Sequence, residues 1–218
     1  MKVVLLSLCV ACASNAHDPG IPRAREAQGL STVRVDAMCI VLDPFSDGDT
    51  PKIPDSIAFG SGMATGVVVS NRHILTANHA VACPEIPYVT VVFPDGHRRR
   101  TMVVREDVKL DLALLEVQSA DPIPGAYPPT IGSVQPGDPV CSVTAAPTWG
   151  WNCGTVDKFY DRSKKGDIGF HAHIAPGNSG SGLYDIEGRL VGITVMMAHD
   201  SDQYSFATSL NDHRWMLP

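Results

Sequence analysis

Residues 176–181 read Pro-Gly-Asn-Ser-Gly-Ser, and they lie between two short apolar runs that each predict a β-strand. The glycines on both sides of Ser179 allow the backbone to turn tightly and leave little bulk around the serine hydroxyl. A serine is a weak nucleophile unless an adjacent base, held by a third group, activates it. The stretch therefore makes Ser179 a candidate nucleophile whose partners must come from elsewhere in the chain.

Candidates for the base and the carboxylate lie upstream, next to apolar runs. His79 follows Ile-Leu-Thr-Ala-Asn, and Asp111 precedes Leu-Ala-Leu-Leu. These neighbours predict that both side chains are partly buried, and a buried polar group needs a partner. A carboxylate bonded to one side of the imidazole and a serine on its other side would satisfy all three. Asp107 and Asp138 are alternative carboxylates, but Asp107 lacks the apolar run that follows Asp111, which ranks first.

The remainder of the chain is typical of an all-β protein. Its 218 residues include 19 glycines and 17 prolines, and only 18% are charged, which favours many turns between short strands. Twelve short apolar runs from residue 33 to residue 207 predict twelve strands in a sandwich or a pair of barrels. The proline-rich segment 122–139 predicts a crossover between halves at about 33–121 and 136–210, and a short helical segment is expected from Leu210.

Composition and spacing also limit the partners of the chain. With 17 Lys and Arg against 23 Asp and Glu, the net charge of −6 offers no basic surface for nucleic acid. His171 and His173 lie two residues apart and could ligate a metal, but no third ligand has a suitable spacing and no Cys-x-x-Cys pair occurs. We therefore expect no nucleic-acid partner and no metal, and nucleophilic chemistry by a serine needs no organic cofactor.

The N-terminus has the pattern of a signal peptide over residues 1–16. Lys2 precedes an apolar run that is too short to span a bilayer as a helix, and small residues follow it; a buried N-terminal strand is the alternative. Cys12 resembles the lipid-modified cysteine of bacterial lipoproteins, although Cys9 stands where such motifs usually carry leucine. We expect a secreted or periplasmic protein, with a membrane anchor at Cys12 left open, and a polar tether over residues 17–32.

Removal of residues 1–16 leaves an even number of cysteines, Cys39, Cys83, Cys141 and Cys153. Four cysteines in an exported chain are compatible with two disulfides in any of three pairings. Cys141 and Cys153 flank a segment with proline, glycine and tryptophan that predicts a hairpin turn. We prefer a bridge across this hairpin, which leaves Cys39 to pair with Cys83.

The order of His79, Asp111 and Ser179, together with their surroundings, resembles the chymotrypsin-fold serine proteases, and the bacterial glutamyl endopeptidases and HtrA protease domains in particular. The matching stretches and residue order extend this resemblance over about residues 33–210. It implies a trypsin-like serine protease domain over 33–218. Its fold would be two antiparallel six-stranded β-barrels packed face to face, with the active site in the cleft between them.

The resemblance also implies a role for each site residue. Ser179 would be the nucleophile, His79 the general base and then the acid, and Asp111 the group that orients the imidazole. The backbone N–H groups of Gly177 and Ser179 would form the oxyanion hole. The chain would be an exported serine endopeptidase, a monomer, acting on a peptide or protein substrate through an acyl-enzyme. The alternatives are a catalytically silent exported protein that binds partners with this fold, and an esterase, which the residue order disfavours.

By the same resemblance, the substrate pocket would be shaped by His173, Ile174, Thr194, Val195 and Met196. His173 stands where relatives that cut after Lys or Arg carry Asp, so we expect a preference for small or medium apolar residues instead. Val195 stands where relatives often carry a hydroxyl that supports the catalytic carboxylate.

Overall fold

The computed structural model describes residues 31–42, 57–83, 86–123, 128–146, 149–161, 165–198 and 201–218. The predicted signal peptide, the lipidation candidate Cys12 and the tether up to residue 30 lie outside the described residues. Within the described ranges, no helix is long and apolar enough to cross a membrane.

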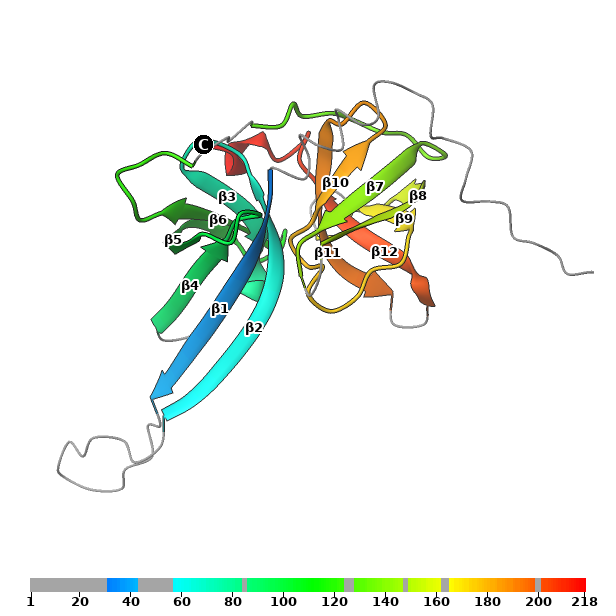
Figure 1. The fold of residues 1–218 in the computed structure, drawn as a ribbon. Coiled ribbons are helices and arrows are strands. Elements are labelled where there is room, and N and C mark those ends of the chain that lie inside the picture. Colours follow the sequence, from blue (N-terminus) through cyan, green and yellow to red (C-terminus); the bar gives the residue numbers. More distant parts are fainter. Residues whose placement is uncertain are drawn as a thin grey trace, which may run out of the picture.

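The first half of the chain forms a closed barrel of six strands (Figure 1). In chain order, the strands are β1 (Thr32–Leu42), β2 (Ile57–Val68), β3 (His73–Ala77), β4 (Ile86–Val92), β5 (Arg98–Asp107) and β6 (Leu112–Val117). Around the barrel they follow the order β1-β2-β3-β6-β5-β4. A single 3-10 turn, Asn78–Ala80, follows β3.

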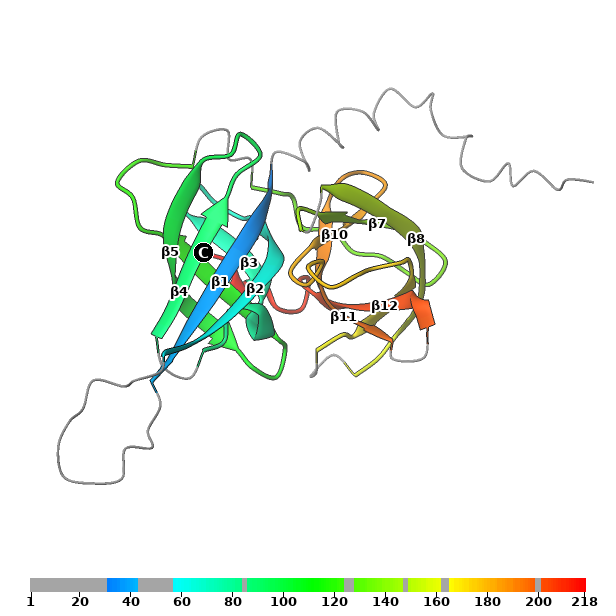
Figure 2. The same ribbon diagram turned by 60° about the horizontal axis from the view of Figure 1, so that its bottom comes forward.

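The second half forms another closed six-stranded barrel, which stands beside the first in both ribbon views (Figures 1 and 2). Its strands are β7 (Pro139–Thr144), β8 (Gly150–Phe159), β9 (Ile168–His171), β10 (Gly182–Asp185), β11 (Leu190–Ala198) and β12 (Ser201–Ser209). They follow the order β10-β11-β12-β9-β8-β7 around the barrel. Neighbouring strands in both barrels are antiparallel, which confirms the predicted all-β, two-barrel fold.

Apolar packing explains why the two barrels stand together. Each barrel encloses a buried cluster of its own, rich in valine, leucine and isoleucine. A third buried cluster joins the barrels, because it combines Leu75 and Leu112 of the first with Tyr184 and Ile193 of the second. Burial of such side chains at the boundary stabilises the pair by roughly 1.5–3 kcal/mol per large apolar residue.

The end of the chain returns to the first barrel. A 3-10 turn, Arg214–Met216, follows β12, and Met216 is buried in the cluster between the barrels. The Arg105 guanidinium of β5 donates hydrogen bonds to the carbonyl groups of Trp215 and, at 3.0 Å, Leu217. The short helical segment expected here is therefore one 3-10 turn that ties the second barrel to the first.

Strand β2 is longer than the sequence predicts. The apolar run Gly66–Ser70 predicts a strand, but β2 begins already at Ile57, because the Gly60-Ser61-Gly62 segment pairs with β1 without interruption. Glycine and serine favour a turn locally, but antiparallel pairing along the whole of β1 supplies partners for these backbone groups.

Two disulfides join the predicted cysteine pairs, Cys39 with Cys83 and Cys141 with Cys153. The first attaches the segment after β3 to β1. The second bridges the β7–β8 hairpin at residues that pair directly in the ladder.

Candidate active site

The antiparallel ladder of the first barrel brings His79 and Asp111 together. Strand β3 pairs with β6, and Ala77 lies opposite Leu112. The residues that follow β3 and those that precede β6 therefore lie at the same end of the sheet. His79 lies in the 3-10 turn after β3, and Asp111 immediately precedes β6. Ser179 comes from the second barrel, in the loop between β9 and β10.

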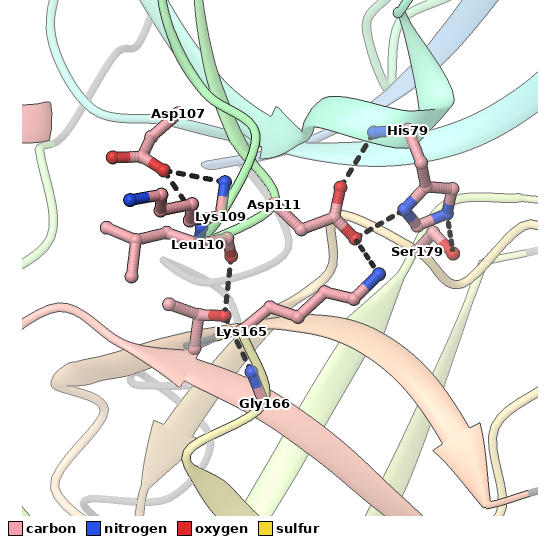
Figure 3. Close-up of polar contacts among 9 residues, drawn as sticks. His79, Asp107, Lys109, Leu110, Asp111, Lys165, Gly166 and Ser179 are labelled. Carbon is pink, nitrogen blue, oxygen red and sulfur yellow. Dashed lines mark hydrogen bonds and ion pairs between the residues drawn. The ribbon is translucent and has the colours of Figure 1, made fainter. Parts of the chain in front are cut away.

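The three predicted side chains form one hydrogen-bonded chain (Figure 3). The Nδ1 atom of His79 lies 2.7 Å from Oδ2 of Asp111. The backbone N–H of His79 donates to the other carboxylate oxygen of Asp111, at 2.8 Å. The Nε2 atom of His79 lies 2.9 Å from Oγ of Ser179. A carboxylate that accepts from both the backbone and the ring of one histidine fixes that ring in position.

Burial differs sharply across this chain of groups. The Asp111 side chain is 4% exposed, whereas that of His79 is 47% exposed. Burial by itself would raise the pKa of the Asp111 carboxyl, but the hydrogen bonds from His79, and the nearby charge of Lys165, hold that pKa below its ordinary value of 3.8. Asp111 is thus held as a carboxylate, the form that can orient and stabilise an imidazolium.

The loop that carries Ser179 requires glycine at two positions. Ala175 accepts a hydrogen bond from the N–H of Asn178, with Pro176 and Gly177 between them, and Gly177 has a φ of 99°; proline followed by a glycine with positive φ is the pattern of a type II turn. Gly180 also has a positive φ, 85°. A Cβ there would lie 2.0 Å from the Thr65 carbonyl oxygen, so no side chain fits.

Thr65 of β2 anchors this loop to the first barrel. Its N–H donates to the carbonyl of Ser179 at 2.9 Å. Its hydroxyl donates to the carbonyl of Gly177 at 3.1 Å and accepts from the N–H of Ala145 at 3.0 Å. The sequence does not predict this role for Thr65. A threonine at the start of an apolar run is more often a core residue whose hydroxyl is already hydrogen-bonded.

The predicted oxyanion-hole donors lie on the same turn. Within the described part of the chain, neither Gly177 N–H nor Ser179 N–H donates to another protein group. Two uncommitted donors beside a serine hydroxyl are what a developing oxyanion requires.

Asn178 fixes the turn from its buried side. In the amide orientation that satisfies both of its groups, it donates to the Ala146 carbonyl at 2.9 Å. It also accepts from Ala175 N–H and the Asn152 amide, each at 3.2 Å.

The five predicted pocket residues differ in exposure. Ile174, Thr194 and Val195 are buried, whereas His173 and Met196 are exposed. Thr194 bonds through its backbone to Gly180 and Ser181, so it supports the serine loop from behind. Two cavities of about 500 and 230 Å³ lie on the first barrel, and none of the five residues lines either one.

The two alternative carboxylates, Asp107 and Asp138, accept hydrogen bonds from backbone N–H groups of turns. Oδ1 of Asp107 accepts from the N–H groups of Lys109 and Leu110, at 2.8 and 2.9 Å. Asp138 accepts from the N–H of Gln135 at 2.8 Å. Asp107 thereby shapes the turn that leads into Asp111 and is not itself bonded to the imidazole.

No group of three or more His, Cys, Asp or Glu side chains that could hold a metal occurs among the residues that the structure describes. The Nε2 atom of His171 lies 3.9 Å from Asp157, and its ring meets the edge of Tyr204. The chemistry that the site supports is nucleophilic attack by an activated serine.

Comparison with known proteins shows which proteins this chain is similar to. The family model of the trypsin-like peptidase domain matches residues 64–193. The protease Do-like 14 protein of Arabidopsis thaliana is 26% identical over 169 residues, which cover 71% of this chain and 39% of that protein. A periplasmic serine endoprotease DegP-like protein of Rickettsia prowazekii is 26% identical over 164 residues, covering 70% of this chain and 31% of that protein. The chain thus spans 31–39% of the length of these curated relatives.

Among solved structures, the HtrA-type protease AlgW with a decapeptide has a similar fold. Its TM-score is 0.69 at 19% sequence identity, and the match covers 88% of this chain and 63% of that one.

Proposed function

The chain belongs to the trypsin-like peptidase domain family, and from that premise we propose that it is an exported serine endopeptidase. Ser179 is the nucleophile, His79 the general base and acid, and Asp111 the orienting carboxylate. The observation that carries this proposal is the unbroken chain of contacts, 2.7 Å from Asp111 to His79 and 2.9 Å from His79 to Ser179.

The reaction proceeds in two stages, acylation of Ser179 and hydrolysis of the acyl-enzyme. His79 takes the proton of the Ser179 hydroxyl while Oγ attacks the scissile carbonyl carbon, and the carbonyl oxygen becomes an oxyanion facing the N–H groups of Gly177 and Ser179. His79 then gives that proton to the leaving amine, and an acyl-enzyme remains on Ser179. A water molecule loses a proton to His79 and attacks the carbonyl carbon of the ester. The bond from that carbon to Oγ then breaks, His79 returns the proton to Oγ of Ser179, and the acid product leaves.

Two similar proteins support the proposals that the substrate is a peptide and that the chain is exported. The Rickettsia relative is named as a periplasmic serine endoprotease, and the AlgW structure holds a decapeptide. His173 and Met196 are the exposed members of the predicted pocket, and we propose that they contact the side chain before the cleaved bond. A small or medium apolar side chain suits this environment, because His173 stands where relatives that cut after Lys or Arg carry Asp.

Export depends on residues 1–16 acting as a signal peptide. The mass of the exported protein tests this part of the proposal. Cleavage near Ala13 or Ala16 gives an unmodified N-terminus, whereas a lipoprotein retains Cys12 with attached lipid. A chain that keeps residues 1–16 unmodified would contradict both routes. We propose a monomer, which sedimentation of the same sample tests.

Covalent labelling with a fluorophosphonate probe tests the active site without a known substrate. We expect the purified protein to be labelled at Ser179, and expect labelling to disappear in Ser179→Ala and to fall by about 10³-fold or more in His79→Ala. Circular dichroism and thiol titration must show that each variant is folded with both disulfides formed. No labelling of such a folded wild-type protein would overturn the proposal and favour the silent partner-binding alternative.

A further inference from the structure

A lysine of the second barrel lies against the buried carboxylate of the site. The Nζ atom of Lys165, in the segment between β8 and β9, is 3.8 Å from Oδ2 of Asp111. Figure 3 shows the ammonium group and the His79 ring approaching the same carboxylate oxygen from different sides. The serine mechanism described above assigns no role to this cation.

Backbone hydrogen bonds fix the position from which Lys165 reaches Asp111. The N–H of Lys165 donates to the Lys109 carbonyl at 2.9 Å. One residue later, Gly166 N–H donates to Thr208 Oγ1 at 3.0 Å. The same hydroxyl donates to the Leu110 carbonyl at 2.9 Å. The two residues before Asp111 are thus held by the second barrel, and the lysine is held beside them.

The backbone conformation of Asp111 explains why the preceding turn needs these contacts. Asp111 has a φ of 57°. Among the residues that the structure describes, it is the one residue other than glycine with a positive φ. Such a conformation is costly for most side chains, although Asp tolerates it better than most. It persists when surrounding contacts hold it. The hydrogen bonds that Lys165 and Thr208 donate to the turn before Asp111 help to hold this conformation.

Charge gives Lys165 a second effect. Asp111 is almost fully buried, and a buried carboxylate is stabilised by a cation more than by neutral donors alone. The charged and titratable groups near it are His79 from the first barrel, Asp107 and Lys109 on its own turn, and Lys165 from the second barrel. Asp107 faces the turn amides, and Lys109 makes no ion pair with Asp111 among the described contacts. Lys165 is therefore the permanent cation at the carboxylate.

We propose that Lys165 is a positioning residue of the active site, which holds the Asp111 carboxylate from across the barrel boundary and counters part of its negative charge beside His79. This inference rests on the proposed function. An ammonium group beside Asp111 offsets part of the attraction between that carboxylate and an imidazolium. Removal of the ammonium group should therefore favour the imidazolium form of His79. Because the Lys165 side chain is 48% exposed, the effect is moderated by solvent and salt.

The decisive measurement is the pH profile of fluorophosphonate labelling. The acid limb of this profile is the pH range over which the second-order rate constant of labelling falls as the pH is lowered. In Lys165→Met we expect the acid limb to move to higher pH by about half a unit, the size typical of one charge in a partly solvated site. Lys165→Arg retains the charge and should keep the limb within about 0.2 unit of wild type. Lys158→Met removes a lysine that pairs with Asp157 and should leave both limb and rate unchanged.

Thr208→Val separates position from charge. It removes the hydroxyl that bonds to the Leu110 carbonyl and to Gly166 N–H but keeps the cation. Labelling should therefore slow by several fold, while the acid limb moves less than in Lys165→Met. A limb that stays in place in folded Lys165→Met, or that moves equally in Thr208→Val, would overturn the inference. If Lys165→Met does not fold, Lys165→Gln takes its place, because it also removes the charge.

A second readout remains informative if the wild-type protein is not labelled. Histidine NMR follows the titration of His79 directly in Ser179→Ala, with and without Lys165→Met, and His79→Gln identifies its signal. An upward movement of the midpoint in the Lys165→Met background supports the inference, and an unchanged midpoint overturns it. Absent labelling with a shifted midpoint would refute the proposed function alone.

Discussion

Asp111 shows how a single residue of the proposed active site can also affect stability. Its burial would raise the pKa of the carboxyl, but the hydrogen bonds from His79, with the charge of Lys165, lower that pKa below 3.8. A carboxyl with a lowered pKa in the folded state contributes to the free energy of unfolding above the unfolded pKa. That contribution is lost as pH falls through the folded pKa. The carboxylate that we propose as the orienting group therefore also makes the fold sensitive to acid.

Asp111→Asn should remove this pH-dependent contribution. We expect the variant to be less stable than wild type at pH 5–7, because it loses a charged acceptor. We expect the difference in the free energy of unfolding to shrink as pH falls below about 3.8. Urea unfolding of both proteins at a series of pH values measures it. A difference that stays constant down to pH 2, where wild-type Asp111 is increasingly protonated, would contradict this account.

At the residue scale, the sequence predicts groups that carry a local signature. Glycines around Ser179 and apolar runs beside His79 and Asp111 mark positions where a polar side chain is unusual. Lys165 has no such signature, because a lysine in a polar segment between strands ordinarily faces solvent. Its contact with Asp111 depends on how two barrels pack, which no local pattern records. The same is true of Thr65, whose partners lie in the second half of the chain.

At the scale of elements, the prediction was most accurate where strands alternate with clear turns. Twelve strands are expected and the described residues form twelve, but β2 begins well before its predicted start. Gly60-Ser61-Gly62 has the composition of a turn, and its pairing with β1 is set by the whole ladder and not by local preference. The two disulfides were easier to predict, since the hairpin turn between Cys141 and Cys153 left one pair over.

The two disulfides should contribute unequally to stability. Cys39 and Cys83 are 44 residues apart, whereas Cys141 and Cys153 are 12 apart. In the loop-entropy account, removing the first costs about 4 kcal/mol and removing the second about 3 kcal/mol of the free energy of unfolding. Denaturant unfolding of Cys39→Ser/Cys83→Ser and Cys141→Ser/Cys153→Ser measures both.

The larger effect is expected for Cys39 and Cys83, and it should reach the active site. Cys83 lies four residues after His79, so loss of this bridge frees the segment that follows the imidazole. Labelling of Ser179 should slow in this variant under conditions where it remains folded. An equal or larger loss of stability on removing the hairpin disulfide would show that native-state strain or residual structure outweighs loop length.

At the scale of the whole molecule, the site exists because two barrels meet. His79 and Asp111 belong to the first barrel and Ser179 to the second, and neither barrel alone contains the full set. The contacts that join them are the buried apolar cluster, the returning C-terminal turn and a few hydrogen bonds. Thr65 connects the two halves of the site, because it donates hydrogen bonds to the loop of Ser179 and lies on the strand that pairs with β3.

Thr65→Val tests whether this connection positions the nucleophile. Valine keeps the shape of threonine but leaves the Gly177 carbonyl and the buried Ala145 N–H without their partner. We expect a loss of about 1–3 kcal/mol in the free energy of unfolding and at least a tenfold slower labelling of Ser179. Thr65→Ser keeps the hydroxyl and should retain labelling within about threefold of wild type, despite the lost methyl group.

The comparison of these two variants separates positioning from stability. If the hydroxyl only stabilised the fold, Thr65→Val would label as fast as wild type wherever it is folded. If it holds the carbonyl of Gly177, its loss lets the turn rotate and misdirects the N–H groups of Gly177 and Ser179. The rate would then fall even well below the unfolding transition. Because these N–H groups act on the developing oxyanion, the loss should appear in the rate of bond formation and not in probe binding.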